Sequence, residues 1–219
     1  MALRLEEDHA SIVILGGFDP LLLHPLWFRA QGLLGKLEAE AAEVKVVVPD
    51  VAEWGTDALL VQITQGRLLV QAKVESATDA VRDLVLGTLQ ILEHTRTAAL
   101  GLNRSMHFDV GGEAQWHRIG HRLAPKDLWK AHLPSQPGMR SLQIEEAVRH
   151  DGLPGKAVVS VQPSQKYLHG VFFDVNNEIT NADDRPGTAF FAQTIRDHWT
   201  RLLDEARGMA DSVLLEAAR

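Results

Sequence analysis

The feature that most constrains the fold is an order of secondary-structure elements that occurs twice along the chain. Each half is predicted to hold a strand, a helical stretch, three strands and a closing helix, over roughly residues 11–95 and 98–218. This β-α-β-β-β-α order predicts an internally duplicated α+β protein. We expect residues 1–96 and 97–219 to be halves of one compact domain with a continuous core. Amphipathic helices and a one-sided antiparallel sheet must bury each other, so the helices should cover one sheet face.

The clearest local signal is a hairpin in the first half. Ala58–Thr64 and Arg67–Val74 alternate apolar and polar residues on either side of Gln65-Gly66, which is a typical two-residue turn. An amphipathic helix is predicted to follow, because apolar residues recur at helical spacing from Val81 to Leu92. These elements indicate a sheet with one apolar face.

Other strands are less regular in sequence. Val44–Val51 is predicted as one strand interrupted at Pro49, which cannot donate to a ladder and therefore favours an edge position. In the second half, Tyr167–Val175 is predicted as a strand because it is rich in aromatic and β-branched residues.

The last element is predicted to be a long helix from Pro186 to about Ala218, preceded by a loop over residues 183–187. Thirty-odd helical residues span on the order of 50 Å, which exceeds the usual width of a domain of this size. We therefore expect the end of this helix to pack on a protein partner or on a second copy of the chain.

Composition narrows the class of protein. The 219 residues carry a formal charge of −7, which disfavours a protein whose whole surface grips nucleic acid. The chain has no cysteine, so disulfides, thiolate metal sites and a catalytic thiol are excluded. We expect no membrane span, since no apolar run approaches the length needed, and an acidic first segment does not suit a secretory signal. A cytoplasmic location is the expectation.

Positive charge is concentrated in one segment. Residues 96–132 hold 6 basic and 3 acidic residues, a balance of +3. Arginine with neutral histidine suits a phosphate or a carboxylate. The candidate ligand-binding residues are Asn103, Arg104, His107, Arg118, Arg122 and Lys126. The competing interpretation is a hydrogen-bonded strand end beside a solvated helix face.

Two histidines have the spacing of metal ligands. His117 and His121 lie four residues apart on a predicted helix, as in helical zinc sites. The residue after His117 is Arg118, at the position where zinc hydrolases carry a glutamate base. The positive charge of Arg118 disfavours binding of a divalent metal ion beside it. We interpret His117 and His121 as residues on the polar face of the helix. A metal-dependent hydrolase is kept as an alternative, and no cofactor is expected.

Three aspartates follow a phenylalanine at predicted strand ends: Asp19, Asp109 and Asp174. Converging carboxylates can hold Mg²⁺. Helix capping is the favoured interpretation, because duplication would place the first two far apart.

Several short words of the sequence resemble a poorly characterised group of bacterial α+β proteins of similar length. They are Gly17-Phe18-Asp19-Pro20, His24-Pro25-Leu26-Trp27-Phe28, Leu92-Glu93-His94-Thr95, Leu100-Gly101-Leu102-Asn103-Arg104 and Leu123-Ala124-Pro125-Lys126. The resemblance implies a bacterial protein, from a mobile or phage-defence locus. It supplies no catalytic residue.

The sequence thus favours a non-enzymatic binding or assembly subunit that uses its long C-terminal helix to self-associate or to bind a protein. A nucleic-acid or nucleotide binder using the basic 96–132 segment is the first alternative. A metal-dependent hydrolase using His117 and His121 is the second.

Overall fold

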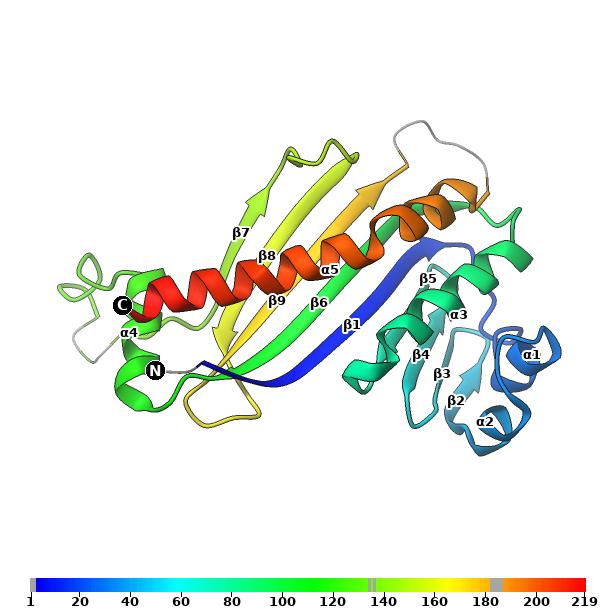
Figure 1. The fold of residues 1–219 in the computed structure, drawn as a ribbon, viewed down its shortest axis with the longest axis horizontal. Helices are drawn as coiled ribbons and strands as arrows, with labels where there is room; N and C mark the ends of the chain where they lie inside the picture. The colour runs from blue at the N-terminus through cyan, green and yellow to red at the C-terminus, as the bar shows by residue number, and fades with distance from the viewer. Residues whose placement is uncertain (1–2, 134, 136, 182–186) are drawn as a thin grey trace.

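The computed structural model describes residues 3–133, 135, 137–181 and 187–219, and across them nine strands form one antiparallel sheet (Figure 1). The strands are β1 (Arg4–Gly16), β2 (Glu43–Val48), β3 (Val51–Gly55), β4 (Leu59–Thr64), β5 (Arg67–Ala72), β6 (Thr97–Asp109), β7 (Leu142–Glu146), β8 (Gly155–Pro163) and β9 (Gly170–Thr180). The helices are α1 (Pro25–Ala30), α2 (Lys36–Ala41), the 3₁₀ turn η1 (Glu75–Ala77), α3 (Thr78–Ile91), α4 (Glu113–Leu123) and α5 (Ala189–Ala218). The α+β prediction and the antiparallel sheet are confirmed.

Strand order follows the same pattern on both sides of the central pair, with four strands outside β1 and three outside β6. The order is β2-β3-β4-β5-β1-β6-β9-β8-β7, with the long strands β1 and β6 paired in the middle. Each of these central strands is flanked by the last strand of its own half, and earlier strands follow outward in reverse order. The sheet therefore runs without a break through both halves.

The helices lie on one face of this sheet. Helix α3 packs on β1 and β5, while α5 crosses β6 and β9 (Figure 1). Strand residues on this face are buried at every second position, as Leu59, Val61 and Ile63 are on β4. This period of two follows from the pleat, and it explains why the alternation in the sequence located the hairpin.

The apolar stripe of helix α5 is buried along the whole helix, so the length of the helix does not by itself require a partner at its end. Its first half joins one hydrophobic cluster through Phe191, Ile195 and Trp199. Its second half joins another through Ala206 to Ala217, against β6, β8, β9 and α4. The long sheet, set by β1 and β6, gives the helix a surface of matching length. The start predicted at Pro186 falls outside the described residues, as does most of the preceding loop.

Two strand predictions are wrong in detail. The predicted strand Val44–Val51 is two strands, because Pro49-Asp50 forms the turn of a hairpin between β2 and β3. The first half therefore has four strands after its helices. In the second half, β9 continues beyond Val175 through Asn176 and Asn177 to Thr180. Partners on both sides, β6 and β8, hold these asparagines in the sheet despite their preference for turns.

None of the helices in the described residues is both long and apolar enough to cross a membrane.

Candidate functional site: the helix-free face of the sheet

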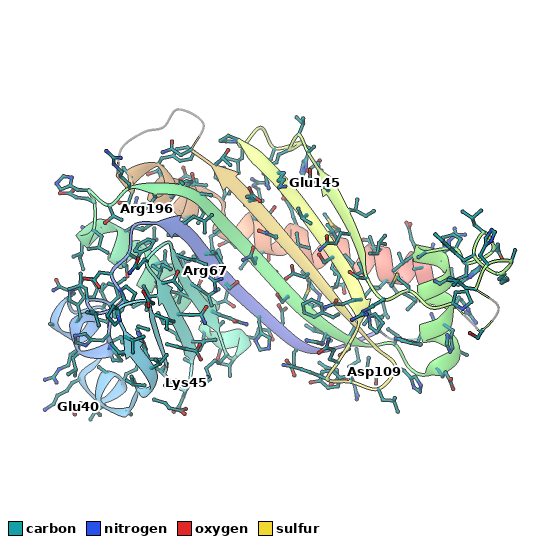
Figure 2. The ribbon with its side chains drawn as sticks, turned by 180° about the vertical axis from the view of Figure 1, so that it is seen from behind. Glu40, Lys45, Arg67, Asp109, Glu145 and Arg196 are labelled. Carbon is teal, nitrogen blue, oxygen red and sulfur yellow. The ribbon has the colours of Figure 1, made fainter. Side chains whose placement is uncertain are left out.

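Among the described residues no helix covers the second face of the sheet, which Figure 2 presents from behind the view of Figure 1. Its central strands carry hydrogen-bonding side chains where the first face carries apolar ones. We define the polar band as two adjacent cross-strand rows of the ladder: Ser105, Asp174 and Ser160, and beside them Ser11, Asn103 and Asn176. These side chains are buried or partly buried even without helical cover.

Asp174 is at the centre of the polar band. Its carboxylate accepts a hydrogen bond from the Ser105 hydroxyl at 2.5 Å. Burial raises the pKa of Asp174, and the bond from Ser105 only partly offsets that effect. In the described part of the chain no cationic side chain pairs with this carboxylate. Asp174 lies inside β9, and Asp19 and Asp109 accept turn amides, from Leu21 and Gly111, that lie outside the helices. The helix-capping interpretation is therefore wrong for all three aspartates.

Two amide oxygens of the polar band converge over Gly101, on the side of their row away from Asp174, without donors. The Oδ1 atoms of Asn103 and Asn176 are buried and have no hydrogen-bond partner among the described residues. Each lies 3.4 Å from the point that a Cβ on Gly101 would occupy. Asn103 uses its amide nitrogen to donate to Ser11 at 3.3 Å. Buried acceptors without donors cost free energy, and these two oxygens are closed to solvent as the side chains stand.

One end of the polar band is closed by a cluster around Glu7. Its carboxylate accepts hydrogen bonds from Lys166, the Tyr167 hydroxyl at 2.9 Å and His9 at 3.0 Å. The bonds from Lys166 and His9 lower the pKa of Glu7 to about 2. This cluster ties the β8–β9 loop to β1.

His107 also contacts the β8–β9 loop. Its Nδ1 is 2.9 Å from Ser164 Oγ, and that oxygen also accepts the backbone N–H groups of Lys166 and Tyr167. Burial lowers the pKa of His107, so the ring is neutral near pH 7, and it packs on Phe172 at 4.8 Å between ring centroids. Because Ser164 Oγ accepts hydrogen bonds from two backbone N–H groups of the loop, the contact between His107 and Ser164 stabilises the loop conformation.

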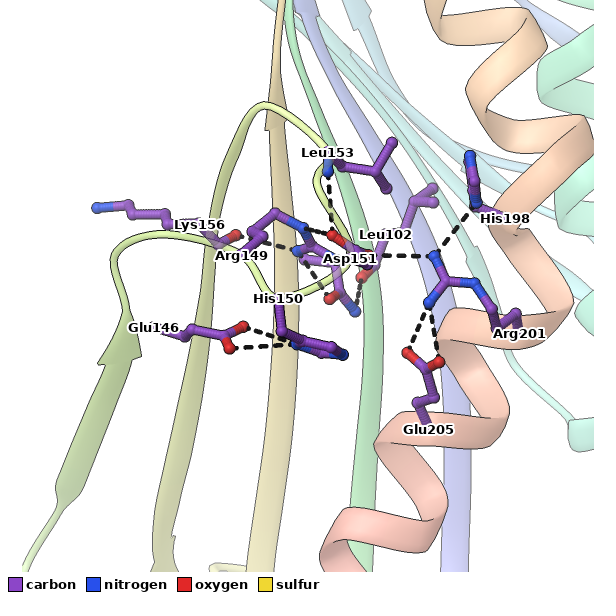
Figure 3. A network of polar contacts seen from close by, with 11 residues as sticks. Leu102, Glu146, Arg149, His150, Asp151, Leu153, Lys156, His198, Arg201 and Glu205 are labelled. Atoms are coloured by element: carbon purple, nitrogen blue, oxygen red, sulfur yellow. Dashed lines mark hydrogen bonds and ion pairs between the residues drawn. The ribbon is translucent and has the colours of Figure 1, made fainter.

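On the opposite face, a charged network fixes the β7–β8 loop to α5 (Figure 3). Arg149, with a side chain 1% exposed, pairs with Asp151 at 2.7 Å and donates to Asn177 on β9. Asp151 also pairs with Arg201 of α5 at 3.1 Å. Burial opposes ionisation of Asp151, but the bonds from Arg149, Arg201 and the Leu153 amide outweigh it and hold its pKa well below the usual range. Each charge of this triad is matched, which is typical of a structural clamp.

A second buried ion pair lies on the helix face, where Arg104 forms a two-pronged contact with Asp8 at 2.8 and 2.5 Å. Arg104 also donates to the carbonyl of Leu203 in α5. A cavity of about 350 Å³ adjoins this pair between η1 and α5, lined in part by Glu75, Asp204 and Trp199.

The structure separates the six ligand-binding candidates from the sequence. Asn103 and His107 lie on the helix-free face, Asn103 inside the polar band, whereas Arg104 points to α5. Arg118 and Lys126 donate to the carbonyls of Ala218 and Gly120 at the far end of the molecule. Arg122, on the same helix, is exposed. The basic 96–132 segment is therefore not one continuous face.

The two histidines of the metal alternative are exposed on α4. His117 lies 3.6 Å from Glu113, and His121 lies 3.6 Å from Asp127. Across the ranges that the structure describes, no group of three or more His, Cys, Asp or Glu side chains is placed to hold a metal ion.

Sequence reasoning did not single out Ser105, Ser160 or Asn176. A signal was present, because polar residues occupy every second position from Asp174 to Thr180 while apolar residues occupy most of the positions between them. The Asn-Asn pair was taken as the end of the strand, and this hid the alternation. Comparison of the chain with protein-family models and with curated proteins gave no match.

Proposed function

We propose that this protein is a non-enzymatic binding subunit that receives a partner polypeptide on the helix-free face of its sheet. The observation that carries the proposal is that no helix covers this face in the described residues, although hydrogen-bonding side chains line its central strands and Asp174 among them has no cationic partner there. A polypeptide supplies N–H donors along its backbone and in its side chains. Such a partner would donate further hydrogen bonds to the Asp174 carboxylate, to which the described part of the chain gives only the Ser105 hydroxyl.

The proposal moves the interface away from the C-terminal helix. Helix α5 uses its apolar stripe on its own sheet, so its length gives no support for a partner there. A chain ending near Ala206 would lose part of the second hydrophobic cluster and would test folding more than association. A cytoplasmic complex remains the setting that we propose for the subunit.

A peptide selection tests this proposal. Random 12-residue peptides are selected on the immobilised full chain, and the affinity of each hit is measured by calorimetry. Ser160→Trp fills the polar band and is expected to weaken binding at least tenfold. Met209→Trp, on the solvent side of α5, is the matched control and should leave affinity within twofold.

Three outcomes separate the possibilities. If no peptide is selected, or if only Met209→Trp weakens binding, the helix-free face is not the interface. Light scattering of the full chain identifies a second copy as the occupant if a dimer forms and Ser160→Trp abolishes it. Salt-dependent binding of single-stranded oligonucleotides with no peptide binding would instead favour the nucleic-acid alternative.

We further infer that the two halves arose by duplication. The mirrored strand order about β1 and β6 supports this, since each half runs outward in the same sequence. Superposition of one half on the other, rotated about an axis between β1 and β6, checks it.

A further inference from the structure

The β8–β9 loop, residues 164–169, reaches across one end of the helix-free face. It joins β8 to β9, yet its Lys166 and Tyr167 side chains bond to Glu7 on β1, which lies two strands beyond β9 in the sheet. Between Glu7 and β9 the cross-strand row holds His107 of β6. The His107 ring lies 5.9 Å from the Tyr167 ring, between centroids, and the residue is only 8% exposed. The loop therefore covers His107.

The hydrogen bonds of Ser164, at the start of this loop, fix the protonation of His107. Ser164 Oγ accepts the backbone N–H groups of Lys166 and Tyr167, each at 3.1 Å. A serine hydroxyl accepts two hydrogen bonds and donates one. The remaining contact, 2.9 Å to His107 Nδ1, must therefore be a donation from the hydroxyl to an unprotonated ring nitrogen. The ring is neutral in this arrangement, with its single proton on Nε2.

A second proton on His107 is incompatible with this arrangement. It would place an N–H group on Nδ1, facing an oxygen whose two acceptor positions are already occupied. Either the ring must leave Ser164, or the loop must give up one of the two amide bonds that shape it. The charge of one imidazole is therefore coupled to the conformation of the loop.

The groups around the His107 ring determine when it becomes charged. β1 presents Glu7 and His9, the loop presents Lys166 and Tyr167, β9 presents the uncharged Phe172, and on β6 itself Asp109 is paired with Arg4. Burial is the largest effect and lowers the pKa of His107; Lys166 and His9 lower it further, while Glu7 raises it. The ring is therefore neutral near pH 7 and becomes charged only as pH falls below the usual histidine value of 6.5.

We propose that the β8–β9 loop is a pH-sensitive latch, which protonation of His107 opens. The charged ring no longer accepts the Ser164 hydroxyl proton and is drawn to Glu7, its cross-strand neighbour. There it competes with Lys166 and Tyr167, so both attachments of the loop weaken together. Opening uncovers the His107 end of the helix-free face in mildly acidic solution. The latch needs no partner, so it is independent of the docking proposed above.

NMR on the ¹⁵N-labelled full chain between pH 7.5 and pH 4.5 tests the latch. Long-range ¹H–¹⁵N spectra follow the rings of His9, His107 and His169 separately and show which nitrogen carries the proton. At pH 7.5 we expect the His107 proton on Nε2. Hydrogen exchange measures the protection factors of the Lys166 and Tyr167 amides, which should fall at least tenfold with the same midpoint as the His107 titration.

Two variants identify the responsible ring. His107→Gln has no titratable group at this position and should keep the amide protection within twofold down to pH 4.5. His9→Gln, the matched control beside the same glutamate, should still show the tenfold loss.

Four outcomes would overturn the latch. They are a His107 proton on Nδ1 at pH 7.5, loop protection that does not change with pH, an acid-induced loss that persists in His107→Gln, and a loss that disappears in His9→Gln. The first two are measured on the unmodified chain, so they decide the matter even if a variant does not fold.

Discussion

The two faces of the sheet treat buried charged groups in opposite ways. On the helix face, Arg149 with Asp151 and Arg104 with Asp8 pair every buried charge and extend the pairing to neighbouring carbonyls and amides. On the helix-free face, Asp174 and the two asparagine oxygens stay partly unmatched. Burial is substantial on both faces. The difference teaches that matched buried charges act in holding the fold together, whereas the unmatched carboxylate marks the face on which we propose that a partner docks.

The largest expected effect on stability concerns the paired charges of the helix face. Arg149→Met leaves the Asp151 carboxylate buried without its main partner, and should lower the free energy of unfolding by about 3–5 kcal/mol. Urea unfolding followed by circular dichroism measures it. Arg201→Met removes a more exposed partner of the same carboxylate and should cost clearly less. Equal losses of unfolding free energy in the two variants would contradict the view that the burial of the arginine sets the size of the effect.

The next effect concerns pH and the Glu7 cluster. The pKa of Glu7 is about 2 in the folded chain against a usual 4.5, so its ionised form stabilises the fold. That contribution is complete above about pH 4.5 and is lost as pH falls towards 2. Glu7→Gln should cost about 1.5 kcal/mol at pH 7 and progressively less in acid. Urea unfolding between pH 3 and 7 measures this, with exposed Glu93→Gln as the control; a pH-independent difference would refute it.

The stability of the protein should depend on the ionisation of Asp174, on the helix-free face, with the opposite sign. Because burial raises the pKa of Asp174, its ionised form opposes folding, and stability is lost as pH rises from the usual 3.8 through the raised pKa. Asp174→Asn should therefore raise the free energy of unfolding at pH 7 by about 1 kcal/mol. Thermal unfolding at pH 7 and pH 3 checks it, and the gain should shrink at the lower pH. A destabilised variant would show that Asp174 is structural.

The smallest effect is expected at the basic helix. Arg122 is exposed on α4, away from the polar band, so Arg122→Ala should change the free energy of unfolding by less than about 0.5 kcal/mol. It should also leave peptide binding unchanged. Fluorescence anisotropy with a single-stranded 20-mer at low salt provides the opposing check, since a marked loss of affinity there would revive the nucleic-acid alternative.

The sequence predicted elements where one periodicity prevailed. The hairpin of β4 and β5 and the stripe of α3 were located correctly, because apolar residues facing the core leave a period of two or of 3.6. The prediction failed at Pro49-Asp50 and at Asn176-Asn177, where the turn preference of the residues and the pairing of strands had to be weighed against each other. Pro49 marked a turn between two strands, while flanking strands held the asparagines in β9.

The candidate site was less accessible from the sequence. Asn103 and His107 were identified, but Arg104 between them faces the other side of the sheet, since neighbouring residues on a strand point to opposite faces. Arg118, Arg122 and Lys126 lie close to them in sequence and yet at the end of the molecule, because α4 leaves the sheet after β6.

The sequence by itself determined the α+β class, most elements and the apolar face, because those depend on local propensity and on the spacing of apolar residues. Only the tertiary structure decided that β1 and β6 pair at the centre of one sheet, that the apolar stripe of α5 packs within its own chain, and that Asp174 lies on the helix-free face with only Ser105 as a donor in the described residues. These features depend on strand order and register, which join residues about a hundred positions apart and leave no local periodicity to read.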